Sequence, residues 1–460
     1  MKLKHLPEAS LHPPSHGDAD LADAARPSWV LLDFSAYIAD RHNSTTASCM
    51  TRDKKKIQVT FFPVHPPRVS YFCVYCHGEE PSGFALEPKV IATDDSVVLL
   101  RVAIGSPNAI ICPSLYEYYV YQASGGTDGG PSLELLPHPS PYFFYDEQVG
   151  ILCRGSQYTI VALRDDASAF FRGSSIPGHY DVCLFESEKK VWTTKAVFLP
   201  LGLQQASNGD EGFQHKTSKV ITIGGTSGTM AFVDLWRGIV LFNVFGGDSM
   251  LGYLTLPQPI SPIPFWKDNC SPSFTRDIAV VNGRFQFVEF MDKICTGLHG
   301  GYINDGWVAA TWSREVFSPQ EGSWCQGHRL ESCNINVDHN PLPFGLLPKL
   351  PGDEGKSQMI FQRLHTGHPT LSLHHDDIIY VMAKVELQDS KAWILAFDMG
   401  NGTLQGVAEF GAARTLDISL TYTQSRISKH LIVAPGTKGD MKRPGSPLLG
   451  SHAKKLLSSR

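Results

Sequence analysis

Residues 219–257 constrain the fold more than any other stretch of the sequence. Four short runs rich in Val, Ile, Leu or Phe follow one another there, and most of the joints between them contain glycine. Such runs predict antiparallel strands connected by tight turns. Four strands in under about forty residues is the size of one blade of a β-propeller. The predicted strands are Lys219–Ile223, Met230–Leu235, Arg237–Val244 and Leu251–Leu256.

The same pattern continues through most of the chain. Apolar runs bounded by Gly, Asn and Pro recur, and the 3.6-residue period of helices is nearly absent. One joint is Asn282-Gly283, a strong signal for a two-residue hairpin turn. We therefore predict an all-β fold, a propeller-like ring of about six four-stranded antiparallel units with degenerate repeats. The alternative architecture is a pair of stacked β-sandwich domains.

Composition divides the chain into three parts. Residues 1–26 are polar and contain Pro13-Pro14, so they are predicted to be disordered. Residues 27–435 form the predicted all-β domain. Residues 436–460 contain two prolines, four glycines and few β-branched residues. This tail is predicted to be disordered as well, because it cannot bury enough apolar surface to offset its ordering entropy.

Charge and hydropathy exclude several classes of protein. The net charge of −5 gives no sign of a nucleic-acid or anionic-membrane surface. No run approaches the ~20 apolar residues that cross a bilayer, and the N-terminus lacks the apolar segment of a secretory signal. We expect a cytosolic or nuclear protein that binds neither membrane nor nucleic acid. Its ten cysteines should then stay reduced.

A family resemblance is carried by FVDLWRGIVLFNV at 232–244. This segment resembles the signature of the plant domain-of-unknown-function 1618 family, which is expanded in grasses. The resemblance implies a plant protein, and it carries no chemistry over to this chain. Family members often have Asp where Asn243 stands here, which argues against a required acid at that position. Flanking pieces match in the same order: PSWVLLD (27–33), VHPPRVSYFCVYC (64–76), TRDIAVVNGRFQFVEF (275–290), HPTLSLHHDDIIYVMAKV (368–385) and AWILAFDM (392–399).

One motif invites a metal or haem interpretation. Residues 73–77, Cys-Val-Tyr-Cys-His, fit the C-x-x-C-H pattern of covalent haem attachment. A zinc site would need further ligands, and no second cysteine pair stands at a matching distance. Side chains alternate along a strand, so a strand from Val69 would send Cys73 and Cys76 to opposite faces. We therefore predict two structural cysteines and no bound zinc or haem.

Three further motifs have simpler structural interpretations. The glycine-rich segment 224–229 precedes a predicted strand, whereas a phosphate-binding loop needs a helix after it. The run 374–377, His-His-Asp-Asp, lies between two predicted strands and reads as a turn rather than a metal site. Asp234 and Trp236 fall on one face of a predicted strand. We expect Trp236 to fill a core between units, with its indole N–H on a local acceptor.

These observations predict no catalytic, cofactor-binding or metal-binding residue and no cofactor. We expect a non-enzymatic β-domain that binds another protein through long loops on a rigid scaffold. The loops that are long enough are 122–131, 202–217 and 338–355. The alternative is an enzyme or a carbohydrate-binding propeller, with a site in the central channel built from acids scattered in the sequence.

The tail generates a testable prediction. Lys442-Arg443 and Lys454-Lys455 are spaced like a bipartite nuclear import signal. Residues 436–460, fused to a reporter too large to diffuse through nuclear pores, should carry part of it into the nucleus, as scored by microscopy. A reporter that stays cytoplasmic, together with no effect of K442A/R443A in the full chain, would reduce the segment to a solvated tail.

Overall fold

The computed structural model describes most of the chain. The described residues are 6–15, 26–105, 115–126, 129–139, 143–165, 176–202, 213–260, 271–296, 302–317, 323–336, 346–348, 360–414 and 421–431. The expectation for the tail 436–460 therefore lies outside the described residues, as do large parts of loops 202–217 and 338–355 and positions 127–128 of loop 122–131.

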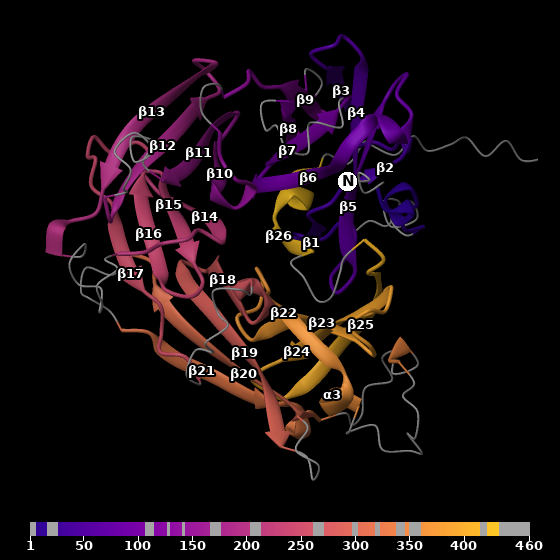
Figure 1. Cartoon of the computed structure of the whole chain (residues 1–460), viewed down its shortest axis with the longest axis vertical. Helices are drawn as coiled ribbons and strands as arrows, with labels where there is room; N and C mark the ends of the chain where they lie inside the picture. The colour runs from indigo at the N-terminus through magenta and orange to yellow at the C-terminus, as the bar shows by residue number, and fades with distance from the viewer. Residues whose placement is uncertain are drawn as a thin grey trace, which may run out of the picture.

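Six β-sheets stand in a ring around a central channel (Figure 1), which confirms the all-β, propeller-like prediction. Five of the sheets have four strands that follow one another in sequence from the channel outward. Their strands are β6 (Phe84–Asp94), β7 (Val97–Ile104), β8 (Glu117–Gln122) and β9 (Ser132–Leu135); β10 (Val149–Arg154), β11 (Gln157–Asp165), β12 (His179–Glu186) and β13 (Val191–Phe198); β14 (Lys219–Gly224), β15 (Thr229–Asp234), β16 (Gly238–Asn243) and β17 (Gly252–Thr255); β18 (Arg276–Val281), β19 (Arg284–Thr296), β20 (Tyr302–Glu315) and β21 (Cys325–Glu331); β22 (His365–Leu371), β23 (Ile378–Lys384), β24 (Lys391–Asp398) and β25 (Thr403–Gly411).

The remaining sheet joins the two ends of the domain. Its order is β26-β1-β5-β4-β3, and β2 pairs with β5. The innermost strand therefore comes from the far end of the sequence, and Figure 1 shows yellow β26 beside indigo β1. The sequence analysis did not predict this pairing between the two ends of the domain. The strands are β1 (Val30–Asp33), β2 (Tyr37–Ile38), β3 (Ala47–Met50), β4 (Lys56–Phe62), β5 (Val69–Cys76) and β26 (Tyr422–Ser425).

The core lies between neighbouring sheets rather than in one central mass. Central strands bury both faces, as in β15, where every residue is buried. One apolar cluster fills each of the six gaps around the ring. Between the fifth and sixth sheets in chain order, Trp307 is completely buried, with its ring centroid 4.8 Å from Phe290 and 5.4 Å from Phe397. A strand with two buried faces explains why the runs read as continuously apolar.

The hairpin signal at Asn282-Gly283 is confirmed. Val281 pairs with Arg284, so these two residues alone form the turn between β18 and β19. Their φ angles are 50° and 76°. A two-residue turn with both φ angles positive matches the twist of the flanking strands and favours Asn-Gly.

Helices in the described part of the chain are short, and none is both long and apolar enough to span a bilayer. They are η1 (Glu8–Leu11), η3 (Pro81–Gly83), η6 (Asp146–Gln148), η8 (Pro272–Phe274), η9 (Ser332–Asn334), α3 (Ile360–Arg363) and η12 (Ile427–His430). The sequence suggests disorder for 1–26, yet residues 6–15 contain η1 and pack against the first sheet. The carbonyl of Pro14 accepts hydrogen bonds from Arg41 Nη1 at 3.0 Å and from Tyr71 Oη at 2.7 Å.

A buried ion pair reinforces the closure of the ring. Arg414, which follows β25, contacts Asp33 at the end of β1 through Nη2, and both side chains are 5% exposed. Arg414 Nη1 also donates to the carbonyl of Ser35 at 3.0 Å, and the guanidinium lies 3.7 Å from the centroid of the Tyr37 ring. These contacts tie the last full sheet to the first strand of the domain.

Removing this pair tests how much the closure contributes to stability. Arg414→Leu leaves the Asp33 carboxylate buried and unpaired, so the free energy of unfolding should fall by about 3–5 kcal/mol in urea titrations. Lys391→Met is the matched control, because Lys391 and Glu409 form an ion pair in which both side chains are 53% exposed. The control should cost at most about 1 kcal/mol. Equal losses for the two variants would contradict this role for Arg414.

Candidate functional site

The central channel forms a concave site in the described part of the protein. Its walls are the innermost strands β26, β6, β10, β14, β18 and β22, and they enclose a cavity of about 1280 Å³. We call the end where these strands reverse direction the turn end; it includes Asp94, Cys153, Asn282 and Arg426. The opposite end, which includes Lys216, Trp236 and Ser273, is the loop end.

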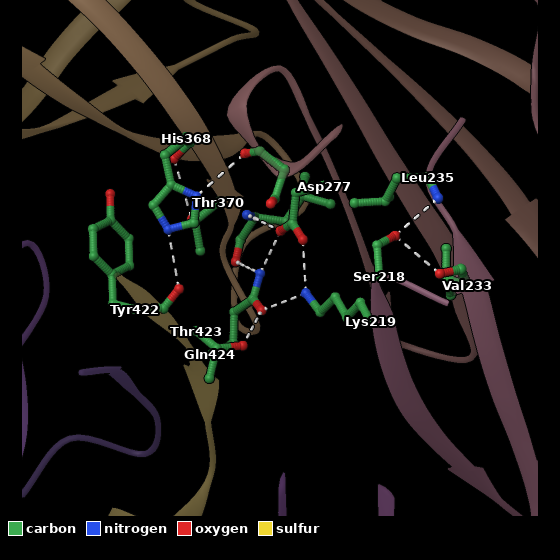
Figure 2. Close-up of polar contacts among 12 residues, drawn as sticks. Ser218, Lys219, Val233, Leu235, Asp277, His368, Thr370, Tyr422, Thr423 and Gln424 are labelled. Carbon is green, nitrogen blue, oxygen red and sulfur yellow. Dashed lines mark hydrogen bonds and ion pairs between the residues drawn. The ribbon is translucent and has the colours of Figure 1, made fainter. Parts of the chain in front are cut away.

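A polar bridge crosses the channel between the two ends (Figure 2). Lys219 Nζ donates to Asp277 Oδ1 at 2.7 Å and to Gln424 Oε1 at 2.9 Å. Gln424 Nε2 in turn donates to Asp277 Oδ2 at 2.6 Å. The backbone N–H of Leu371 completes the carboxylate's shell at 3.0 Å from Oδ2. Each of the three side chains therefore forms a hydrogen bond with the other two.

The bridge connects sheets that are not neighbours. Lys219 lies on β14 and Gln424 on β26, whose sheets are three positions apart in the ring of six. Asp277 on β18 and Leu371 on β22 come from two further sheets. The side chains of Lys219 and Asp277 are 20% and 9% exposed. Such a buried charge pair is tolerated only because donors occupy both oxygens of the carboxylate.

His368 adds a second link beside the bridge, as Figure 2 shows. Its Nε2 lies 3.1 Å from the carbonyl of Tyr422, and its Nδ1 lies 3.3 Å from that of Ser273. A neutral imidazole can donate to only one of these oxygens. Burial lowers the pKa of His368, so the ring is neutral at pH 7. His368 has a φ of 54° at an irregularity in β22, which turns its side chain toward β26.

The turn end holds an acid with few partners. Asp94 ends β6, and its Oδ2 accepts a hydrogen bond of 2.8 Å from the backbone N–H of Cys153. Burial raises the pKa of Asp94 to about 7. Its neighbour Asp95 instead bonds His430 Nε2 at 2.6 Å. A carboxyl that is half protonated near neutral pH and faces a cavity can bind a cation or exchange a proton.

The loop end differs because its acids are fully engaged. Asp234 Oδ2 accepts from the backbone N–H of Lys216 at 2.9 Å and from Arg237 Nη1 at 3.1 Å, and Oδ1 accepts from the N–H of Trp236. Asp234 thus holds the turn between β15 and β16. Nearby, buried Arg276 pairs with Glu289 and donates to the carbonyl of Leu235. This geometry is structural and leaves no free carboxylate.

The prediction for Trp236 was wrong in three respects. Trp236 lies in the turn rather than on the strand face, and it is half-buried at the rim of the channel instead of filling a core. Its ring lies 4.8 Å from the guanidinium of Arg276, a cation–π contact, and its indole N–H has no acceptor among the described residues. Period-two alternation failed here because the strand ends at Asp234.

The other motifs lie as the sequence suggested. Cys73 joins a small cluster with Tyr37 and Tyr71, whereas Cys76 lies in the larger core beside Val74, so β5 sends the two thiols to different faces. The segment 224–229 connects β14 to β15 as a hairpin. His374 and His375 lie in the turn before β23, where both backbone N–H groups donate to Ser372 Oγ.

Acids line the channel without converging on a common point. Within the described residues no group of three or more His, Cys, Asp or Glu side chains could hold a metal ion. Asp146 pairs with Lys89 at 3.0 Å, Asp234 with Arg237 and Asp277 with Lys219. The acids of the described channel are therefore paired one by one rather than gathered at a single point.

Sequence analysis missed Lys219, Asp277, Gln424 and Asp94. A signal for the first two was present, because each is a charged residue at the start of an otherwise apolar strand run, KVITI and DIAVV. A charge in such a run must find a partner or face a cavity. The sequence does not say which partner, because Lys219 and Asp277 are 58 positions apart and Lys219 and Gln424 are 205 apart.

Comparisons with known proteins agree with the sequence resemblance and add no activity. A family described as "Protein of unknown function (DUF1618)" matches residues 232–380. No curated protein sequence matches the chain. Among solved structures, a prolyl endopeptidase is 11% identical, with a TM-score of 0.31, over 83% of this chain and 50% of that one. This chain therefore spans half the length of that protein.

Two other solved structures are similarly distant. A protein of unknown function from Dyadobacter fermentans is 10% identical, with a TM-score of 0.30, over 84% of this chain and 97% of that one. An α-L-arabinofuranosidase from Lactobacillus brevis is 8% identical, with a TM-score of 0.27, over 72% and 88%. Likenesses this weak bear on neither activity nor ligand.

The bridge can be tested by removing one charge or both. Lys219→Met leaves Asp277 without its counter-ion, so the free energy of unfolding should fall by about 3 kcal/mol. Adding Asp277→Asn removes the stranded charge and should restore about 1 kcal/mol or more. Lys216→Met is the control, because its exposed side chain has no described partner, and it should change stability by less than about 0.5 kcal/mol. Urea unfolding of all four proteins measures this; a double variant no better than Lys219→Met would contradict the pairing.

Proposed function

We propose that this protein is a non-enzymatic propeller that binds another protein through the face at the turn end of the channel. The observation that carries the proposal is a pair of exposed aromatic side chains there. Phe245 is 45% exposed and Phe317 is 66% exposed. They flank the glycine turn 224–228, and we call these residues with Arg154 the aromatic rim.

Both aromatic side chains of the rim lie close to the glycine turn, and the contact at Gly228 leaves no room for a Cβ. At Gly228, where φ is 61°, an added Cβ would lie 2.5 Å from the ring of Phe245. At Gly225 an added Cβ would lie 3.6 Å from the ring of Phe317. Both rings therefore lie close to the turn. Rigid exposed rings offer contact area at little cost in conformational entropy.

Arg154 completes the rim. Its guanidinium lies 4.0 Å from the centroid of the Phe245 ring, and Nη2 donates to the carbonyls of Gly225 at 3.2 Å and Thr226 at 2.7 Å. Arginine and aromatic residues are enriched at the centres of protein interfaces. Gly224 also lines the channel, so a partner seated on the rim would reach the channel mouth. The segment 232–244, which resembles the plant family, follows this turn in the chain, and we take the chain to be a plant member of that family.

The alternative, an enzyme or carbohydrate-binding site in the channel, has less support. It requires acids that act together, and the acids of the described channel are paired individually with cations or capped by backbone N–H groups. The aromatic rim requires no such convergence, which is why we favour binding of a protein.

A comparative capture experiment tests the proposal. Tagged full-length protein is used to capture partners from native tissue, followed by mass spectrometry, beside Phe245→Ser/Phe317→Ser and the matched control Phe198→Ser. Phe198 is 40% exposed on β13, away from the glycine turn. The wild type and the control should retain a partner that the double variant loses by at least about tenfold, because buried interface aromatics contribute 2 kcal/mol or more.

Stability must be measured alongside, and the double variant should change the free energy of unfolding by less than about 1 kcal/mol. A partner captured equally by the double variant, or no protein captured above background by the wild type, would contradict the proposed face.

A further inference from the structure

Two opposite charges at the turn end face the same cavity without touching each other. Asp94 ends β6, and the only hydrogen bond to its carboxylate from a described residue comes from the backbone N–H of Cys153. Arg426 follows β26 and is exposed, and no described residue pairs with its guanidinium. The positive charge of Arg426 nevertheless acts on Asp94 and lowers the cost of ionising it.

The neighbouring polar groups are already engaged elsewhere. Asp95 bonds His430 at 2.6 Å, and Arg154 bonds the carbonyls of the glycine turn. The thiol of Cys153 lies 3.6 Å from Ser96 Oγ. Apart from the backbone N–H of Cys153, none of these groups bonds the carboxylate of Asp94. A buried carboxylate with a single donor is costly, and acids with a shifted pKa in a cavity occur preferentially at binding sites.

We call the part of the channel cavity between the polar bridge and the turn end the vestibule. We propose that it binds a free α-amino acid, with its ammonium group on Asp94 and its carboxylate on Arg426. A zwitterion is the class of small solute that satisfies both charges at once, since each end forms a charge-assisted hydrogen bond. A simple amine would leave Arg426 unpaired, and a simple carboxylic acid would leave Asp94 unpaired.

The walls favour an apolar side chain on that amino acid. Ile221, Ile223 and Leu373 are half-buried and line the cavity. Their exposed apolar surface would be covered by an aliphatic group of similar size. The polar bridge crosses the channel beyond them, so the vestibule lies between the bridge and the turn end. L-Leucine is therefore the probe that fits this description.

The test is isothermal titration of the full-length protein with L-leucine at pH 8. Two analogues separate the charges: 4-methylpentanoic acid lacks the ammonium group, and 3-methylbutylamine lacks the carboxylate. Both should bind at least about tenfold more weakly than L-leucine, the effect of losing one charge-assisted hydrogen bond. An amine that binds as tightly as L-leucine would overturn the amino-acid assignment, because Asp94 would then recognise cations alone.

Variants of the two anchors complete the experiment. Asp94→Asn and Arg426→Gln should each weaken L-leucine binding at least about tenfold. The controls are Asp95→Asn, which keeps a residue that tolerates the φ of 48° there, and Lys429→Gln on η12; both should bind within about twofold of wild type. Asp94→Asn removes an unpaired buried charge, so it should fold at least as well as wild type.

The pH dependence gives an independent readout. Protonation of Asp94 competes with the ligand ammonium, so affinity should fall as pH drops from 8 to 6, and Asp94→Asn should lose this dependence. The other groups facing Asp94 are Arg426, Asp95, which forms a hydrogen bond with His430, and Cys153, whose thiol has its pKa raised by burial. No heat from L-leucine up to about 10 mM, or wild-type affinity in both anchor variants, would overturn the proposal.

Discussion

Inside the channel, the ammonium of Lys219, the carboxylate of Asp277 and the amide of Gln424 form hydrogen bonds with one another, and the arrangement of the sheets depends on this network. Lys219, Asp277 and Gln424 come from three different sheets, and the backbone of Leu371 adds a fourth. Moving a charge pair from water to a nearly closed site is costly. That cost is offset here because the carboxylate of Asp277 receives three donors. The hydrogen bonds of this network can all form in only one arrangement of the strands that carry the three side chains. The network therefore depends on direction, whereas apolar packing does not.

Apolar packing between neighbouring sheets contributes most of the favourable free energy of folding. Six clusters fill the gaps around the ring, with rings such as Trp307 completely buried. Burial of apolar area is roughly proportional to the area removed and tolerates small slides between sheets. The bridge inside the channel and the Arg414–Asp33 pair at the closure restrict those slides. Stability and geometry are therefore supplied by different kinds of contact.

The two ends of the channel are chemically different, and this difference organises both proposals. At the loop end, the side chains of Asp234 and Arg276 already form hydrogen bonds with backbone groups and ion pairs with other side chains. At the turn end, Asp94 and Arg426 form no ion pair with each other, and the aromatic rim lies at the same end of the channel. A propeller whose turn end carries both an open polar vestibule and exposed rings can bind a small solute and a protein partner on the same face.

The amino-acid sequence by itself determined the class of fold. Runs of β-branched and aromatic residues separated by glycine and asparagine specify strands and turns locally, as Asn282-Gly283 does, and alternation placed Cys73 and Cys76 on opposite faces. Only the tertiary structure decided which strand closes the ring, because β26 has four residues and carries too little local signal. It also seated residues 6–15 against the first sheet, moved Trp236 to the rim, and joined Lys219 to Gln424 across 205 positions. The physical reason is the distance along the chain over which each effect acts. Propensity and periodicity depend on neighbouring residues. The partners of a buried charge instead depend on desolvation and geometry, which are set only after distant segments have come together.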